Sequence, residues 1–578
     1  MNKGTKDGKV TTSAYSVEEI EMSDASRRAS EKGYYLDPES GDSGSIKDTQ
    51  EYDIQRGLKS RHIVLIGLGG CIGTGIFIGT GASLATSGPG PLLISYILMS
   101  TVLWTIMNVL SEMAVYLPIK GVSVVGFVQR YCDDSFAFAC GYNIFYTMAI
   151  LVATEVTAAG LVIRYWNESI NIAVFMTIFL GVITFLNCFP NKYYGEIEFW
   201  FALIKIVTII GLIILGAVIM LGGAPNRERL GFRYWNNPGA FAEHLTTGGT
   251  GRFLGFWTAV IKSGFTFITG PELIITAASE AKRPRYNIPK VASSFVYRIL
   301  AFYVLGSLVI GCTVAYNNPL LLTESSDASA SPFVIAIESA GIKVLPHIIN
   351  AAILTSAWSS GNAFYFSSTR ILLGLARTGQ APAVLKKINR FGVPYNCVLV
   401  VFLFGCLSYL NVSSGSAKVF TWFTNLTTVS GFISWISCCW AYLRFRRAMI
   451  LHGKFEERPY KTRFQPYMSY YSMIFLMLII FTNGYAVFIK GNWDTSNFIA
   501  AYITLPPFFL LWLGHKYYLH RLGKVPFTQV LIPIEDVDIY TGLDIVIAEA
   551  EQDFAEIEAE NATKFNSVFL KPWYWLFG

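Results

Sequence analysis

Charged residues are scarce in this sequence. Asp, Glu, Lys and Arg make up 15% of the 578 residues, whereas hydrophobic residues make up 53% and the mean hydropathy is +0.44. An average soluble domain has about 25% charged residues. The composition therefore excludes a water-soluble protein of this size and predicts an integral membrane protein.

Histidine and cysteine are also few, and their positions suit neither catalysis nor metal binding. The six histidines lie in expected loops or near the ends of apolar runs, and no nucleophile–base pair recurs in the apolar core. The nine cysteines lie mostly inside apolar runs, without metal-ligand spacing. We therefore expect no enzyme, no metal site and no organic cofactor. The net charge of +6 comes from basic loops and does not indicate nucleic-acid binding.

Apolar runs of about 20 residues, long enough to cross a bilayer as helices, recur along the chain. About twelve such runs predict an all-α integral membrane fold in the lipid bilayer, with a membrane domain at 61–518 and soluble tails at 1–60 and 519–578. The N-terminal tail is polar and contains no segment that resembles a signal peptide. The runs lie at about 63–83, 90–114, 137–162, 170–189, 197–221, 254–279, 292–316, 345–374, 397–411, 418–443, 468–490 and 496–518.

Lys and Arg cluster in the loops after the sixth, eighth and tenth runs. Cytosolic loops carry an excess of these residues, so we place these loops in the cytosol. An even number of spans then puts both termini there as well. The loop at 222–252 goes against this rule, because Arg227, Arg229 and Arg233 fall on the predicted outside.

Glycine interrupts two of the runs near their middle. Gly73, Thr74 and Gly75 lie in the first run, and Gly270 with Pro271 lies in the sixth. A helix break in a membrane is tolerated only where the freed backbone faces protein or water. Close helix packing needs only small residues four apart, so this denser cluster favours a break. Two interrupted spans at matching positions in two halves of a chain indicate the binding site of a transporter.

The ends of broken helices suit a ligand that carries both a negative and a positive charge. The half-helix that starts near Thr74 presents free N–H groups and the positive end of its dipole, which favour a carboxylate. Carbonyl groups freed at the breaks favour an ammonium group. We therefore expect a zwitterionic amino acid as substrate. The residues predicted to line its site besides the glycines are Phe265, Phe267, Ile268 and Trp422.

Ionisable residues inside membrane spans are costly and indicate function by default. Glu155 in the third run could bind and release a proton, or could hydrogen-bond a neighbouring helix permanently. Lys205 in the fifth run could replace a coupling sodium ion, or could be the fixed partner of a buried carboxylate. Lys262, just before the second break, could reach the substrate or extend to the outer surface. We assign proton coupling to Glu155 and Lys205, and substrate binding to Glu155 and Lys262.

Three further polar residues within the runs are predicted to be gate or structural elements. Glu112 lies near the cytosolic end of the second run, and Glu272 directly follows Pro271. Asn362 lies in the eighth run, where Ser356 and Ser360 could line the pathway, although Ser often joins helices by hydrogen bonds.

Several motifs occur in the order typical of fungal amino-acid permeases. They are GGCIGTGIF at 69–77, SEMA at 111–114, EIEFWFALIK at 196–205, FTFITGPE at 265–272 and ASEAKRPRYNIP at 278–289. The chain resembles this family, within the amino acid–polyamine–organocation superfamily, from about Arg61 to NSVFLKPWYW at 566–575. The resemblance implies a five-plus-five inverted repeat with broken helices 1 and 6, two added helices, and proton-coupled uptake at the plasma membrane. It places the carboxylate site at Gly73, Thr74 and Gly75, the acid at Glu155 and the lysine at Lys205.

The stretch AVIKSGFTFI at 259–268 is most similar to the proline-permease branch of the family. This similarity implies specificity roles for Lys262 and Phe265, and proline or small neutral amino acids as substrates. Cationic substrates are less favoured because a lysine facing the cavity would repel them. Two alternatives stay open: a permease of broad or cationic specificity, and an amino-acid sensor with little flux.

The tails carry features of regulation. The family resemblance implies that ubiquitin-ligase adaptors act on tail lysines such as Lys3 and Lys47. In the C-terminal tail, apolar residues at helical spacing from Leu543 to Ile557 predict a helix docked on the basic inner loops. Sequons at Asn167 and Asn411 fall in predicted outer loops and could carry glycans.

Overall fold

The computed structural model describes residues 72–118, 124–166, 169–189, 191–268, 270–279, 283–322, 331–389, 392–414 and 416–563. All of them belong to one compact unit, Tyr52–Gly578. The tail lysines and Asn167 lie outside the described residues, so the expectations on them stay predictions.

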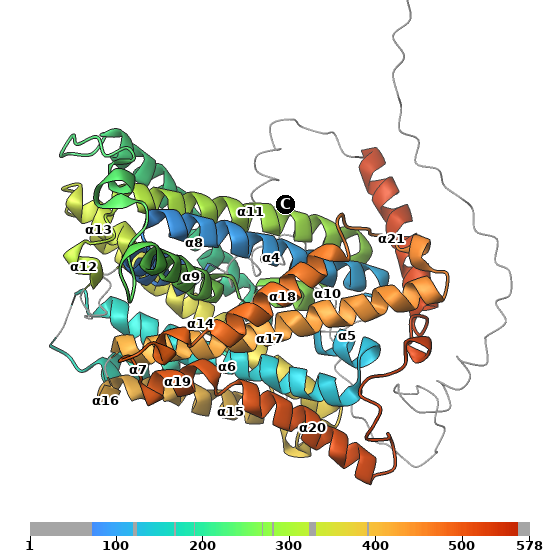
Figure 1. Ribbon diagram of the computed structural model, residues 1–578. Helices are drawn as coiled ribbons and strands as arrows, with labels where there is room; N and C mark the ends of the chain where they lie inside the picture. Colours follow the sequence, from blue (N-terminus) through green and yellow to red (C-terminus); the bar gives the residue numbers. More distant parts are fainter. Residues whose placement is uncertain are drawn as a thin grey trace, which may run out of the picture. The chain divides into compact units, whose positions relative to one another are not determined.

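Helices are the regular secondary structure of the described chain, which has no β-strand in these ranges (Figure 1). This agrees with the predicted all-α class. The helices, in chain order, are η1 (Gly75–Gly79), α3 (Thr80–Ser87), α4 (Pro89–Tyr116), α5 (Val124–Tyr131), α6 (Asp134–Ile163), α7 (Ile172–Leu186), α8 (Asn191–Leu221), η2 (Trp235–Gly239), α9 (Gly248–Phe267), α10 (Gly270–Ser279), α11 (Pro284–Thr313), α12 (Pro319–Leu322), α13 (Pro332–Ser339), α14 (Leu345–Arg377), η4 (Ala383–Lys386), α15 (Tyr395–Gly405), η5 (Cys406–Leu410), α16 (Asn411–Ser414), α17 (Ser416–Leu451), η6 (Phe455–Glu457), α18 (Tyr467–Thr482), η7 (Tyr485–Phe488), α19 (Thr495–Tyr502), α20 (Leu505–Arg521), η8 (Ile534–Asp536) and α21 (Leu543–Thr563).

Five described helices are long and apolar enough to cross a membrane by themselves: α4, α6, α11 and the apolar parts of α8 and α17. The helices α19 and α20, bent by 42°, form a sixth candidate when taken as one broken span. Each of the twelve predicted runs overlaps a described helix, but the others are shorter, broken or less apolar. The count of twelve spans therefore stays a prediction.

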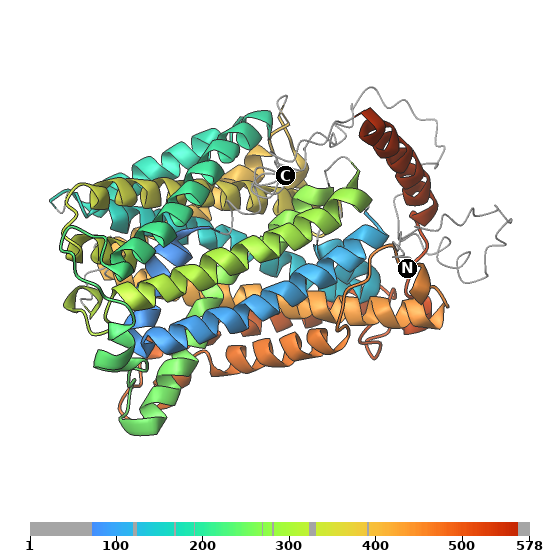
Figure 2. The same ribbon diagram turned by 90° about the horizontal axis from the view of Figure 1, so that it is seen from above.

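The long helices pack lengthwise on one another. Helix α6 contacts both α14 and α17, and α4 contacts α9 and α11; Figure 2 shows α4 and α11 running side by side. Helix α6 is apolar around its whole circumference, as expected for a helix surrounded by others. Its central position brings Glu155 into the interior of the bundle.

The predicted break in the sixth run is present. Helix α9 ends at Phe267, Ile268 is extended (φ −60°, ψ 154°), and α10 begins at Gly270. For the first run, the structure describes the chain only from Ile72 onward. There the backbone bends at 72–73, and π-helical turns at Gly75–Gly79 precede the regular helix α3. Both predicted breaks therefore coincide with irregular backbone.

The C-terminal region contacts the ends of the long helices. Arg130 of α5 forms an ion pair with Asp538 at 2.9 Å, and the Ile532 N–H donates to the Cys132 carbonyl at 2.9 Å. Beyond them, Glu556 of α21 forms an ion pair with Arg283 at 2.8 Å. The predicted docked helix is therefore present.

The buried face of α21 differs from the predicted one. Ile547 and Phe554, which belong to the apolar stripe predicted between Leu543 and Ile557, are 41% and 50% exposed, whereas Val546, Ala550 and Ile557 are buried. The contact made by α21 is therefore a narrower stripe than its apolar spacing predicts.

Asn411 is a poor site for a glycan. Its side chain is buried, and its amide donates to Thr157 Oγ1 at 2.8 Å and to the Ser408 carbonyl at 2.6 Å. Glycosylation needs an accessible amide nitrogen, so a glycan, which the sequon leaves open, does not fit the buried side chain of Asn411.

Candidate functional site

The irregular backbone at the start of the first described helix is held by serine hydroxyls from other elements. Ser356 of α14 donates to the Ile72 carbonyl at 3.0 Å. Ser331, directly before α13, donates to the Phe77 carbonyl at 2.7 Å. Turns of a π-helix leave the regular bonding pattern, and such turns are frequent at functional sites. Protein side chains thus satisfy carbonyl groups that lipid could not.

Gly73 and Gly75 let three helices approach this backbone closely. A Cβ atom on Gly73 would lie 2.9 Å from Glu155 Oε1 of α6 and 3.3 Å from Ser360 Oγ of α14. A Cβ atom on Gly75 would lie 2.9 Å from the Thr266 Cα atom of α9. The first interruption therefore lies against Glu155 of α6 and against Thr266, next to the second interruption.

Glu155 and Thr74 face each other in the interior. Glu155 is 3% exposed, and the Thr74 N–H and hydroxyl lie close enough to the Glu155 carboxyl group to act on it electrostatically. Nevertheless, Glu155 Oε2 and Thr74 Oγ1 have no partner of full hydrogen-bond geometry among the described residues. A buried polar atom without a hydrogen-bond partner lowers the stability of the fold. Binding of a proton or a ligand at this place would explain why such atoms are present.

Lys205 of α8 also acts on this acid. Its side chain is 1% exposed, its Nζ atom donates to Ser360 Oγ at 2.9 Å, and its charge interacts with that of Glu155. The charge of Lys205 also interacts with that of Glu198, a fully buried acid on the same helix. Ser359 Oγ donates to the Glu198 carboxylate at 2.9 Å.

Glu198 belongs to the EIEFWFALIK motif, for which no site role was predicted at this position. The rule that selected Glu155, an ionisable residue within an apolar run, applies to Glu198 as well.

The second interruption is lined by aromatic and small residues. Thr266 Oγ1 shares a hydrogen bond with the Tyr96 hydroxyl at 3.1 Å, and the Phe267 ring packs edge-on against Tyr96 and Tyr303. Phe267 therefore packs into the bundle. Tyr96 and Thr266 are polar neighbours of the break that sequence reasoning missed, because their pairing joins segments 170 positions apart.

Phe265 and Ile268 lie where the two interruptions and α17 meet. The Phe265 ring packs edge-on against Phe420, and a Cβ atom on Gly79 would lie 3.9 Å from it. Ile268 fits against Gly431, where a Cβ atom would lie 3.0 Å from its side chain. Phe265 thus stands between the first described helix and α17.

Lys262 points along α3. Its Nζ atom lies 3.4 Å from the Ala82 carbonyl oxygen and 3.5 Å from Thr86 Oγ1. A cation near the last turns of a helix is stabilised by the helix dipole. The ammonium group also acts on the loop before α9, because burial and, secondarily, the Lys262 charge lower the pKa of His244.

Four of the predicted site residues have their described contacts elsewhere. Trp422 donates from Nε1 to Asn497 Oδ1 of α19 at 3.2 Å, and Asn362 accepts from Asn187, directly after α7, at 2.8 Å. Glu272, in the first turn of α10, is buried beside Trp435. The fourth, Glu112, has the fullest set of contacts.

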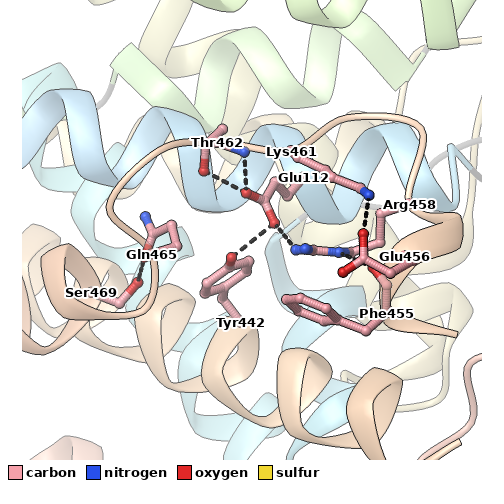
Figure 3. Close-up of polar contacts among 9 residues, drawn as sticks. All are labelled: Glu112, Tyr442, Phe455, Glu456, Arg458, Lys461, Thr462, Gln465 and Ser469. Atoms are coloured by element: carbon pink, nitrogen blue, oxygen red, sulfur yellow. Dashed lines mark hydrogen bonds and ion pairs between the residues drawn. The ribbon is translucent and has the colours of Figure 1, made fainter. Parts of the chain in front are cut away.

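Glu112 lies in a polar cluster that joins α4 to α17 and to the chain after it (Figure 3). One carboxylate oxygen accepts from Tyr442 at 2.8 Å and from Arg458 at 2.7 Å. The other accepts from the Thr462 N–H at 2.7 Å and from the Thr462 hydroxyl. The Arg458 guanidinium in turn lies 3.8 Å from the centre of the Phe455 ring. These contacts link α4 to α17 and to the loop after it, as expected for a residue with a structural role.

Helices interrupted in mid-membrane around buried ionisable groups are the architecture of secondary transporters. The fold agrees with this class. A crystal structure of a manganese transporter from Eremococcus coleocola, in complex with an aromatic bis-isothiourea substituted compound, superimposes with a TM-score of 0.52. It covers 88% of this chain and 100% of that one at 13% sequence identity, so the likeness concerns the fold alone.

The family follows from the sequence match. Residues 62–523 match the amino acid permease family, and the chain belongs to that family. A proline-specific permease of Emericella nidulans is 51% identical over 90% of this chain and 93% of its own length. A proline-specific permease of Saccharomyces cerevisiae is 50% identical over 90% of this chain and 84% of its own. The chain is thus a multi-pass membrane protein of a transporter family.

Proposed function

We propose that this protein imports proline, or another small neutral amino acid, across the plasma membrane together with a proton. The identity of about one half with two proline-specific permeases supports the choice of substrate. The observation that carries proton coupling is the contact between the buried acid Glu155 and the backbone at Gly73 and Thr74. Both termini face the cytosol in this proposal.

The substrate carboxylate binds at the start of η1. Backbone N–H groups at Gly73, Thr74 and Gly75 lie where the chain enters the helix, and the positive end of the helix dipole favours an anion there. The carbonyl groups at the end of α9, around Phe267, suit the substrate ammonium group. Phe265 stands beside the same backbone and covers the apolar ring of proline.

Thr74 couples the proton to the substrate. An ionised Glu155 competes with the substrate carboxylate for the Thr74 N–H and hydroxyl, and it also repels that carboxylate. When Glu155 takes up a proton from the outside, the repulsion ends and both Thr74 donors become free for the substrate. Substrate and proton therefore bind best together, and release of the proton to the cytosol weakens substrate binding. This reciprocity is required of coupled binding sites.

Lys205 is the fixed positive charge of the site. In this proposal it takes the place of a coupling metal ion and pairs with Glu155 after the proton has left. Lys262, near the outer end of α3, repels a cationic substrate, which favours neutral amino acids.

The test is labelled proline uptake by cells that lack their own amino-acid permeases. We expect accumulation against a gradient, faster uptake at acid external pH, collapse with a protonophore, and competition by alanine rather than by lysine. Uptake that ignores pH and protonophore would contradict proton coupling, and preferred lysine uptake would contradict the substrate.

A sensor with little flux is the second candidate. The interrupted helices serve binding alone as well as transport, but a binding protein has no need for titratable groups in its core. Proline that binds to the purified protein without crossing reconstituted vesicles would favour the sensor.

A further inference from the structure

A second acid, Glu198, shares the Lys205 ammonium group with Glu155. Glu198 and Lys205 are seven residues apart on α8, so they lie on one face of the helix, two turns apart. Side chains of long residues in a helix point toward its N-terminus, and Glu198 is on that side of Lys205. Both side chains are buried.

Two adjacent serines of α14 each bond one of these charged groups. Ser359 Oγ lies 2.9 and 3.1 Å from the two carboxylate oxygens of Glu198. A hydroxyl has one proton, so it satisfies one of these oxygens at a time. Ser360 accepts from Lys205. The other stabilisation of an ionised Glu198 comes from the Lys205 charge, which acts on Glu155 as well.

The three groups cannot all be charged at low cost. Two carboxylates and one ammonium in the interior leave one negative charge without a partner, and an unpaired buried charge is strongly unfavourable. The neutral combination has a proton on one of the two acids. An ionised Glu198 therefore draws on the same ammonium group that stabilises an ionised Glu155.

We propose that Glu198 is a positioning residue for proton coupling: by sharing Lys205, it weakens the stabilisation of ionised Glu155 and lets Glu155 accept a proton at a higher external pH. This inference rests on the proposed function. The proton comes from the outer solution, resides on Glu155 during transport and leaves to the cytosol, while Lys205 stays charged. Among the described residues, the groups that act on the two acids are Lys205, Thr74 and Ser359.

The test is the pH dependence of initial proline uptake for the parent and for Glu198→Gln, between about pH 4 and pH 8. The amide keeps an acceptor for Ser359 but leaves the Lys205 charge to Glu155 alone, so Glu155 stays ionised to a lower pH. We expect the pH of half-maximal uptake to fall by about one unit. Glu198→Asp, which keeps the charge, is expected to titrate close to the parent. Ser359→Ala, which removes a donor to ionised Glu198, is expected to shift in the same direction by less.

Ser368→Ala is the matched control. Ser368 is also a buried serine of α14, but it donates to the Tyr365 carbonyl of its own helix. We expect its pH profile to equal that of the parent. Surface amounts measured with an epitope tag separate transport from trafficking, because a merely structural residue would lower the maximal rate without moving the profile.

The outcomes separate the two proposals. A parent protein with no response to pH contradicts the proposed function. A parent that responds to pH, with Glu198→Gln and Ser359→Ala that titrate like it, overturns the role of Glu198. Where Glu198→Gln does not reach the membrane, the profile of Ser359→Ala decides.

Discussion

Glu112 and Glu155 are both carboxylates buried in apolar helices, at 2% and 3% exposure, but their surroundings differ. The two oxygens of Glu112 accept four hydrogen bonds and face the Arg458 guanidinium. Glu155 faces a bent backbone, and its Oε2 atom has no full partner among the described residues. A carboxylate with all its partners can hold helices together, whereas an oxygen without a full partner suits a proton or a ligand. The comparison therefore favours a structural role for Glu112 and agrees with the proposed proton role of Glu155.

The largest effect is expected at Glu112. Glu112→Ala removes four accepted hydrogen bonds and leaves the buried Arg458 without its counter-charge, which costs about 3–5 kcal/mol. We expect a large loss of folded protein and a lower unfolding temperature in detergent.

Glu456→Gln is the control for this prediction. The Glu456 carboxylate is exposed and paired with Lys461 in the same loop, so we expect an unchanged unfolding temperature. Equal unfolding temperatures for Glu112→Ala and the parent would contradict the structural role of Glu112.

Glu155→Gln should give the opposite pattern. The amide has nearly the same shape, so we expect a change in the free energy of unfolding of less than about 1 kcal/mol. Without the proton site, the ratio of internal to external proline should fall to about one, while exchange across the membrane continues. Vesicle accumulation and counterflow assays measure both quantities. A variant that concentrates proline like the parent would assign the proton elsewhere.

Gly75→Ala examines the close approach of η1 to Thr266 of α9. Its Cβ atom would lie 2.9 Å from the Thr266 Cα atom, and backbone cannot move aside as a side chain can. Overpacking of this kind costs about 1–3 kcal/mol, which corresponds to roughly 5- to 150-fold in proline affinity if it falls on binding.

Gly79→Ala is the matched control, because its Cβ atom would lie 3.9 Å from Phe265, an ordinary contact. Measured KM values for uptake compare the two. Equal KM values would show that the two interruptions need not touch.

The smallest effect is expected at the C-terminal end of α3. Lys262→Met removes the charge that, after burial, lowers the pKa of His244, so this pKa should rise toward its ordinary value. The neutral, reactive form of His244 would then appear at a higher pH. The rate of His244 modification by diethyl pyrocarbonate, followed by mass spectrometry across pH, measures the shift. An unchanged profile would place the Lys262 ammonium away from this loop.

Much of the fold could be predicted because its signals are local. The break after Phe267 follows from the Gly-Pro pair that starts α10, and the irregular turns at Gly75 follow from the glycine cluster. The buried face of α21 was predicted less well. The spacing from Leu543 to Ile557 shows that the helix has an apolar stripe, but not which residues at its edges contact the rest of the protein.

The contacts of the candidate site depend on partners that are distant in the chain. Glu155, Lys205 and Ser360 come from three helices, and no spacing rule relates their positions. The position of Asn411 also depends on a distant partner. Its sequon suggests an exposed side chain, but a hydrogen bond to Thr157 holds it in the interior.

The sequence by itself determined that this chain is a membrane protein, at which positions its helices are interrupted, and to which family it belongs. It could do so because composition, glycine placement and motifs are read over short stretches of chain. Only the tertiary structure decided which buried acids are satisfied. Hydrogen bonds and charges depend on distances of a few ångströms, and those distances arise only when helices far apart in the chain pack together.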